Sequence, residues 1–108
     1  ANTGTAVGAL GTVLRTTNGG ASWTSQSSGT TNGLYHVSFS EANIGTAVGL
    51  YGTILRTTNG GSSWTSQSSA TANDLLGVSF TDANTGTVVG DNGTILRTNN
   101  GGAVGFII

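Results

Sequence analysis

The sequence predicts an all-β protein built from β-propeller blades, and three observations lead to this prediction. The chain of 108 residues repeats itself every 41 residues, which is the interval from Arg15 to Arg56 and from Arg56 to Arg97. Threonine, valine, isoleucine and aromatic residues recur between turns rich in glycine, asparagine and serine, as in β-sheet proteins. With 19 glycines and no apolar period of 3.6 residues, helical repeats are excluded. A period near 40 residues then indicates four-stranded propeller blades.

The first, innermost strand of each blade is predicted at residues 34–40 ("LYHVSFS") and 75–81 ("LLGVSFT"). Apolar and polar residues alternate there, which is the pattern of a half-buried strand. The residues expected on one face are Tyr35, Val37 and Phe39, matched by Leu76, Val78 and Phe80.

Three further strands complete the predicted blade. The second strand is "GTAVG" at 4–8 and 45–49, and the third is the "GTVLRTT" or "GTILRTT" segment that follows it. The fourth is "SWTSQSS" at 22–28 and 63–69. Asn-Gly steps after the third strand supply the positive φ angles that a tight hairpin needs.

In this register the chain forms one repeat domain that holds an incomplete arc of about three blades. Its parts are a partial blade at 1–33, a complete blade at 34–74, a third blade at 75–102 and an apolar strand at 103–108. Because a propeller needs about four to eight blades, these residues cannot close a ring alone.

The predicted hairpins "TTNGGASW" (16–23) and "TTNGGSSW" (57–64) carry a specific motif. They resemble the Asp-box, or BNR, hairpin, with asparagine where that family usually has aspartate. The matching residues are Asn18, Gly20 and Trp23, then Asn59, Gly61 and Trp64, and in the third copy Asn100 and Gly102. Taken with "GTILRTTNGG", the chain resembles repeats of the photosystem II assembly and stability factors and of secreted bacterial propellers. The motif implies a fold more than an activity.

Composition excludes several classes of function. The three arginines, the absence of lysine and a net charge of −1 give no basic footprint for nucleic acid or an anionic membrane. Without cysteine there is no disulfide or thiolate metal site, and no apolar run is long enough to span a membrane. We expect no cofactor and no metal. A surface of Ser, Thr, Asn and Gly without lysine favours a secreted or extracellular protein.

The repeated arginines have two interpretations. Arg15, Arg56 and Arg97 would form an arc of three guanidinium groups. The resemblance to the photosystem II assembly factors implies that such a face binds a protein partner. Alternatively, each arginine bonds carbonyl groups of its own hairpin or of the next blade, using its five N–H donors.

The acidic residues and the histidine do not form a catalytic pattern. A glycosidase needs two apposed carboxyl groups, or an arginine triad with a tyrosine nucleophile. Glu41 and Asp82 are repeat equivalents in turns, and Asp74 and Asp91 fall in other turns. The single histidine, His36, has a glycine as its counterpart. We therefore predict a non-catalytic protein, with a carbohydrate-binding or glycosidase fragment as the third hypothesis.

The first hypothesis for function is a structural module that self-assembles through blade faces and strand donation, into a closed oligomer or an extracellular fibre. Its assembly strand would be the apolar tail, with Ala103, Val104, Phe106, Ile107 and Ile108. Alternatively, this tail is the fourth strand of the third blade in a fragment of a longer protein. The second hypothesis is a docking factor similar to the photosystem II assembly factors, which binds a protein through its arginine face.

Overall fold

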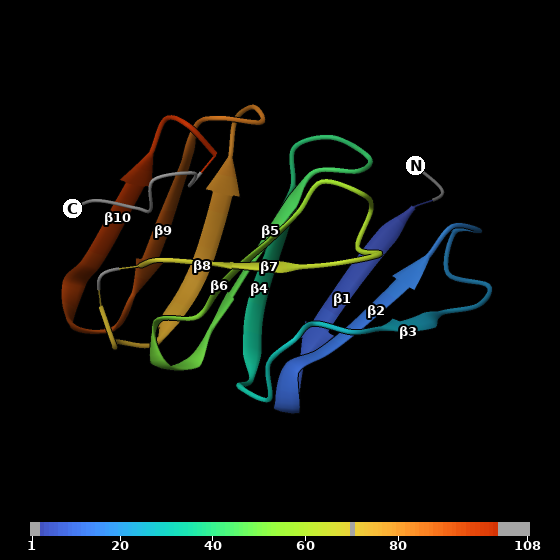
Figure 1. Ribbon diagram of the computed structural model, residues 1–108, viewed down its shortest axis with the longest axis horizontal. Helices are drawn as coiled ribbons and strands as arrows, with labels where there is room; N and C mark the ends of the chain where they lie inside the picture. Colours follow the sequence, from blue (N-terminus) through green and yellow to red (C-terminus); the bar gives the residue numbers. More distant parts are fainter. Residues whose placement is uncertain (1–2, 70, 102–108) are drawn as a thin grey trace.

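The computed structural model describes residues 3–69 and 71–101, which form ten strands in three antiparallel sheets (Figure 1). No helix in these two ranges is long and apolar enough to cross a membrane. The strands are β1 Gly4–Gly8, β2 Thr12–Thr16, β3 Thr24–Gln26, β4 Leu34–Phe39, β5 Gly45–Gly49, β6 Ile54–Thr57, β7 Thr65–Gln67, β8 Leu75–Phe80, β9 Gly86–Gly90 and β10 Thr94–Thr98.

Each sheet is one blade, and the strands within a blade follow chain order. Blade 1 has the order β1-β2-β3, blade 2 has β4-β5-β6-β7, and blade 3 runs from β8 through β9 to β10. Blade 2 is the complete four-stranded unit, and its last strand, β7, crosses the others at a steep angle (Figure 1). The predicted all-β class and the arc of about three blades are therefore confirmed.

The innermost strands carry a β-bulge that the sequence pattern does not reveal. In β4 the pairing with β5 shifts between Leu34 and His36. As a result Leu34 is buried at 3% exposure, whereas Tyr35 is 50% exposed. The alternation expected for this strand does not extend to Tyr35, because a bulge adds one unpaired residue and redirects the side chains beside it. β8 repeats the shift, and there Leu76 is the exposed residue.

The core lies between blades and consists of two layers of aliphatic side chains. Between blades 1 and 2 the buried residues are Val13, Leu34, Ala47 and Leu55. Between blades 2 and 3 they are Val48, Ile54, Leu75, Val78, Val88 and Leu96. Because each layer draws on two neighbouring blades, a blade is stabilised chiefly by the blade beside it.

The two edges of the arc carry different connections between strands. The tight turns Ala9–Gly11, Leu50–Gly52 and Asp91–Gly93 lie along one edge, at the bottom of Figure 1. The loops 40–44 and 81–85 lie along the opposite edge. We call these the turn edge and the arginine edge, because the repeated arginine is near the end of its strand on the second edge.

Candidate functional site

The repeated arginine joins one blade to the next. Arg15, in β2 of blade 1, donates a hydrogen bond from Nη2 to the carbonyl oxygen of Ala42, which follows β4 of blade 2, over 2.9 Å. Its guanidinium carbon also lies 5.2 Å from the centre of the Phe39 ring. Stacking of a cation on an aromatic face adds to the hydrogen bond. These contacts match the second interpretation of the arginine, in which it bonds a carbonyl group of the next blade. Binding of a partner protein through this residue remains a prediction.

Arg56 makes the same contacts between blades 2 and 3. Its Nη2 donates to the carbonyl oxygen of Ala83 over 2.9 Å, and its guanidinium carbon is 5.8 Å from the Phe80 ring centre. Nη1 is buried without a hydrogen-bond partner in the described part of the chain. Burial lowers the pKa of Arg56 from its usual value because it disfavours the charged form.

Arg97 differs from the other two arginines because it is exposed. Within residues 3–69 and 71–101 it has no carbonyl acceptor equivalent to Ala42 or Ala83. Arg15 and Arg56 therefore lie at the two boundaries between the described blades, whereas Arg97, at the equivalent position of blade 3, is exposed on the arginine edge.

The glycine-rich turn of each repeat fits against the arginine of the preceding repeat. A Cβ atom added at Gly60 would lie 3.5 Å from Nη2 of Arg15, and one at Gly101 would lie 3.0 Å from Cζ of Arg56. The outer strand adds a bond at the same place, since Nε2 of Gln67 donates to the Gly101 carbonyl oxygen over 2.9 Å. The ten-residue segment that occurs three times therefore supplies both sides of the contact between blades. The arginine of one copy contacts the Asn-Gly-Gly turn of the next copy.

The hairpin motif forms a compact hydrogen-bonded clip. Oδ1 of Asn18 accepts bonds from the Thr16 hydroxyl over 2.8 Å and from the Ser22 N–H over 3.0 Å. Asn59 repeats this arrangement, and Oδ1 of Asn100 accepts from the Thr98 hydroxyl over 2.8 Å. The expected positive φ angles occur at Gly19, Gly60 and Gly101. Of the other motif residues, Gly20 and Gly61 also have positive φ, and Gly102 lies outside the described residues.

The two tryptophans of the motif have different surroundings. Trp64 packs edge-on against Phe39, with ring centres 6.1 Å apart and an interplanar angle of 89°. Trp23 is 47% exposed, because no described strand of blade 1 supplies the place that β4 fills in blade 2. The tail residues Ala103, Val104, Phe106, Ile107 and Ile108, predicted as an assembly strand, lie outside the described residues.

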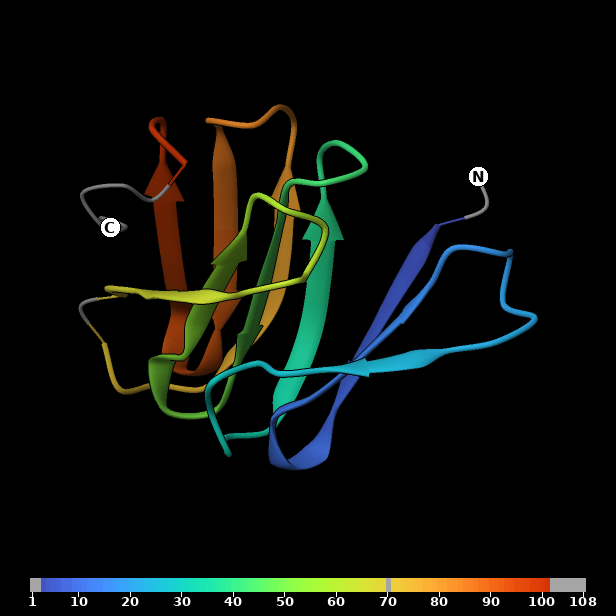
Figure 2. The same ribbon diagram turned by 45° about the vertical axis from the view of Figure 1, so that its right-hand side comes forward.

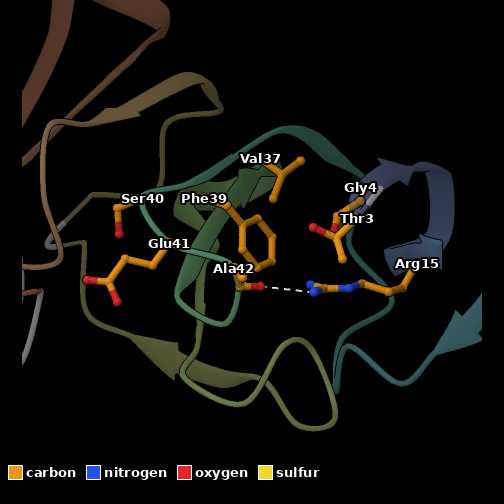
Figure 3. A pocket seen from close by; sticks show the side chains of 9 residues that line it. Thr3, Gly4, Arg15, Val37, Phe39, Ser40, Glu41 and Ala42 are labelled. Carbon is orange, nitrogen blue, oxygen red and sulfur yellow. Dashed lines mark hydrogen bonds between the residues drawn. The ribbon is translucent and has the colours of Figure 1, made fainter. Parts of the chain in front are cut away.

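A pocket of about 470 Å³ opens on the arginine edge between blades 1 and 2 (Figure 3). Its walls include Thr3, Arg15, Phe39, Glu41 and Ala42. Figure 3 shows the Arg15 side chain reaching Ala42 along one wall, while the Glu41 side chain points away from the guanidinium. A cation, an aromatic ring and a hydroxyl thus line one cavity whose carboxylate does not neutralise the arginine.

The side chains of Asp82 and His36 each make hydrogen bonds with backbone N–H groups, in different parts of the structure. Oδ1 of Asp82 accepts hydrogen bonds from the Asn84 and Thr85 N–H groups over 2.8 Å each. These two bonds lower the pKa of the Asp82 carboxyl, and their effect outweighs that of desolvation, which raises it. His36 accepts a bond at Nδ1 from the Val78 N–H over 2.9 Å, which joins β4 to β8. No group of three metal-binding side chains occurs within the described ranges.

Sequence reasoning missed the turn edge. The middle residues of the three tight turns, Leu10, Tyr51 and Asn92, all have φ near +60°. Leu10 is 80% exposed and Tyr51 is 68% exposed. One residue in the sequence indicates this backbone conformation. Asparagine, which tolerates the left-handed region, stands at the equivalent position of the third repeat.

Comparison with known proteins gives matches in structure. No protein-family model matches the chain, and no curated protein matches it in sequence. Among solved structures, "YCF48 bound to D1 peptide" matches with a TM-score of 0.83 and 25% identity, over 94% of this chain and 34% of that chain. YCF48 from Cyanidioschyzon merolae matches with a TM-score of 0.82 and 30% identity, over the same two shares.

The chain thus spans about a third of the length of these two structures. The correspondence covers nearly the whole arc of blades, so the fold is that of part of a β-propeller similar to YCF48. Nothing in the comparisons points to a fibre or to a homo-oligomer.

Proposed function

We propose that this chain is part of a non-catalytic β-propeller that docks a segment of a partner protein on its arginine edge. The observation that carries the proposal is the pocket at Arg15, where a guanidinium group is held in place by one backbone acceptor and one aromatic ring. That arrangement orients the cation before a ligand arrives, which lowers the entropic cost of binding.

The chemistry of the pocket suits a peptide. Arg15 has five N–H donors, and a single hydrogen bond joins it to the described residues, so donors remain for carbonyl or carboxylate oxygens. Phe39 offers apolar surface beside them. The neighbouring structure "YCF48 bound to D1 peptide" supports this type of partner. The proposed role is therefore that of an assembly or docking factor, similar to the photosystem II assembly factors that the sequence resembles.

Binding of a D1 peptide, measured by fluorescence anisotropy, is the first test. We expect Thr3→Trp, which places a large side chain in the pocket, to weaken binding at least tenfold, and Thr3→Ser to leave it within about twofold. Arg15→Gln should weaken binding more than the matched change Arg97→Gln at the exposed arginine. Equal affinity of the Thr3→Trp and parent proteins would show that this pocket is not the docking site.

A second candidate function is blade-to-blade self-association, which one observation favours. Val48 and Ile54 are fully buried against blade 3, whereas their repeat equivalents Val89 and Ile95 are 45% and 58% exposed. Figure 2 shows the β9–β10 face at one end of the arc. A second copy that placed its blade 1 on this face would bury the same kind of surface that blades 2 and 3 bury between them.

Light scattering coupled to size-exclusion chromatography tests the second candidate. If copies associate through this face, Ile95→Glu should convert the oligomer to a monomer, and Leu76→Glu on the turn edge should not. An unchanged mass for both variants would exclude association through β9–β10.

The non-catalytic part of the proposal rests on how the carboxyl groups are placed. Glu41 and Asp82 follow the innermost strands of different blades, and Asp74 is bonded to a turn of blade 2. Asp91 lies beside Asp74, whose carbonyl oxygen accepts a hydrogen bond from the Asp91 N–H over 2.9 Å. We expect no acid and base pair for a glycosidase from these positions. A secreted or extracellular location remains a prediction from composition.

A further inference from the structure

A second, apolar groove lies on the turn edge between blades 1 and 2, at the opposite ends of the strands from the arginine pocket. It has a volume of about 550 Å³, and its lining includes Leu10, Gly33, Tyr35, Leu50 and Tyr51. Leu10, Tyr35 and Tyr51 are all at least half exposed. Three large apolar or aromatic side chains therefore gather at one open groove, an arrangement typical of interaction sites.

Two of these side chains are held on unfavourable backbone. Leu10 and Tyr51 both have φ of 59°, a region where a side chain with a Cβ atom is disfavoured. Asn92, at the equivalent position of blade 3, is a residue that adopts this conformation more readily. Stability alone would favour asparagine or glycine at all three turns. Backbone stability therefore does not explain the leucine and the tyrosine beside the groove. Residues held in disfavoured backbone regions cluster at ligand sites, which is a second explanation for them.

At the boundary between blades 2 and 3, the equivalent turn binds a carboxylate group. The Tyr51 N–H donates a hydrogen bond to the carboxylate oxygen Oδ1 of Asp74 over 3.0 Å. The repeat equivalents of these residues are Leu10 and Gly33. Gly33 has no side chain, and no residue in the described ranges accepts a hydrogen bond from the Leu10 N–H. The contact that Asp74 makes at the boundary between blades 2 and 3 therefore has no counterpart within the chain at the boundary between blades 1 and 2.

Position 33 also has space for the first atom of a side chain. A Cβ atom added at Gly33 would meet the Leu50 side chain at 3.4 Å and the Ala9 Cα at 3.9 Å, which are ordinary contacts. Leu10 and Gly33 both line the groove, and the glycine places no side chain against the Leu10 N–H.

We propose that this groove binds a peptide segment of a partner protein that presents an aspartate side chain to the Leu10 N–H. An apolar side chain next to that aspartate would lie among Leu10, Tyr35 and Tyr51. The occupant takes the place that Asp74 fills at the boundary between blades 2 and 3. This site is separate from the arginine pocket and does not depend on it.

The test uses an acetylated, amidated hexapeptide with an Asp-Phe pair, titrated into the full chain labelled with ¹⁵N. We expect the amide resonance of Leu10 to move downfield as its N–H gains an acceptor, while that of Asn92, at the equivalent turn outside the groove, stays in place. Replacing the aspartate of the peptide by alanine should raise the Kd at least tenfold. Absence of a Leu10 shift, or binding by the alanine peptide with equal affinity, would overturn the proposal.

Variants of the chain provide the matched controls. Gly33→Asp supplies the missing carboxylate from within and should abolish peptide binding, whereas Gly33→Ala should bind within about threefold of the parent. Leu10→Asn should lose binding while retaining or raising the melting temperature, which separates loss of the site from loss of the fold. Undiminished binding by Gly33→Asp would refute the proposal, as would binding that requires a free C-terminal carboxylate on the peptide. Thr3→Trp, which fills the arginine pocket, should have no effect on this peptide.

Discussion

Arg56 of blade 2 donates a hydrogen bond from Nη2 to the carbonyl oxygen of Ala83 in blade 3, and the two atoms are 2.9 Å apart. The bond crosses the boundary between two sheets that share an aliphatic core layer. Its donor is charged and partly removed from water, as the lowered pKa of Arg56 indicates. Contacts of this kind couple neighbouring blades, so their loss should be felt in the stability of the whole arc.

Replacing Arg56 by methionine tests that coupling. The methionine retains apolar contact with Phe80 but removes the charge-assisted bond, so we expect a loss of about 2 kcal/mol in the free energy of unfolding. Arg97→Met is the matched control, because Arg97 is exposed and should change stability by less than about 0.5 kcal/mol. Urea unfolding followed by tryptophan fluorescence measures both. Equal stabilities of the two variants would contradict a structural role for Arg56.

Gly52 and Gly93 occupy equivalent positions in the tight turns, with φ of +75° and +73°. Alanine at Gly93 meets no atom of the described residues within 4 Å, so its cost should be that of the left-handed backbone alone, about 1 kcal/mol. Alanine at Gly52 would also overlap the backbone carbonyl oxygen of Thr71. We expect Gly52→Ala to cost about 1 to 3 kcal/mol more than Gly93→Ala in urea unfolding. Similar losses would mean that the loop at Thr71 can move aside.

Much of the fold could be predicted from the sequence because it is repetitive. The spacing from Arg15 to Arg56, the alternation around Val37 and the Asn-Gly steps each report local structure that recurs in every blade. The bulge at Tyr35 could not be predicted, because one extra residue in a strand leaves the composition of the strand unchanged.

The candidate sites were less predictable than the fold. The arginines were identified, but their acceptors, Ala42 and Ala83, are backbone atoms that a side-chain pattern does not reveal. The groove on the turn edge depends on the absence of a side chain at Gly33 where the next repeat has Asp74. The sequence shows this difference between the repeats, but only the hydrogen bond from the Tyr51 N–H to Asp74 shows which contact the glycine removes.

Asp82 should make the stability of the chain depend on pH in acid. The Asn84 and Thr85 N–H groups bond its carboxylate and lower its folded-state pKa below the usual 3.8. The stabilisation is present above the unfolded-state pKa and is lost as the pH falls through the folded-state value. We expect Asp82→Asn to weaken the decrease in melting temperature between about pH 5 and pH 2. Glu41→Gln, at the equivalent position, is the control. An identical pH dependence in parent and Asp82→Asn proteins would refute this assignment.

Trp23 and Trp64 should differ in their access to solvent, although they occupy the same place in the repeat. Trp64 is covered by the Phe39 ring, whereas Trp23 is 47% exposed. The variant Trp23→Phe, which retains only Trp64, should therefore emit at shorter wavelength and be quenched less by acrylamide than Trp64→Phe. Adding Phe39→Leu to the Trp23→Phe protein removes the covering ring and should raise quenching, while Phe80→Leu at the other boundary should not. Equal quenching of the two single variants would mean that another group covers Trp23 in solution, and the uncovered flank of blade 1 would then have a partner.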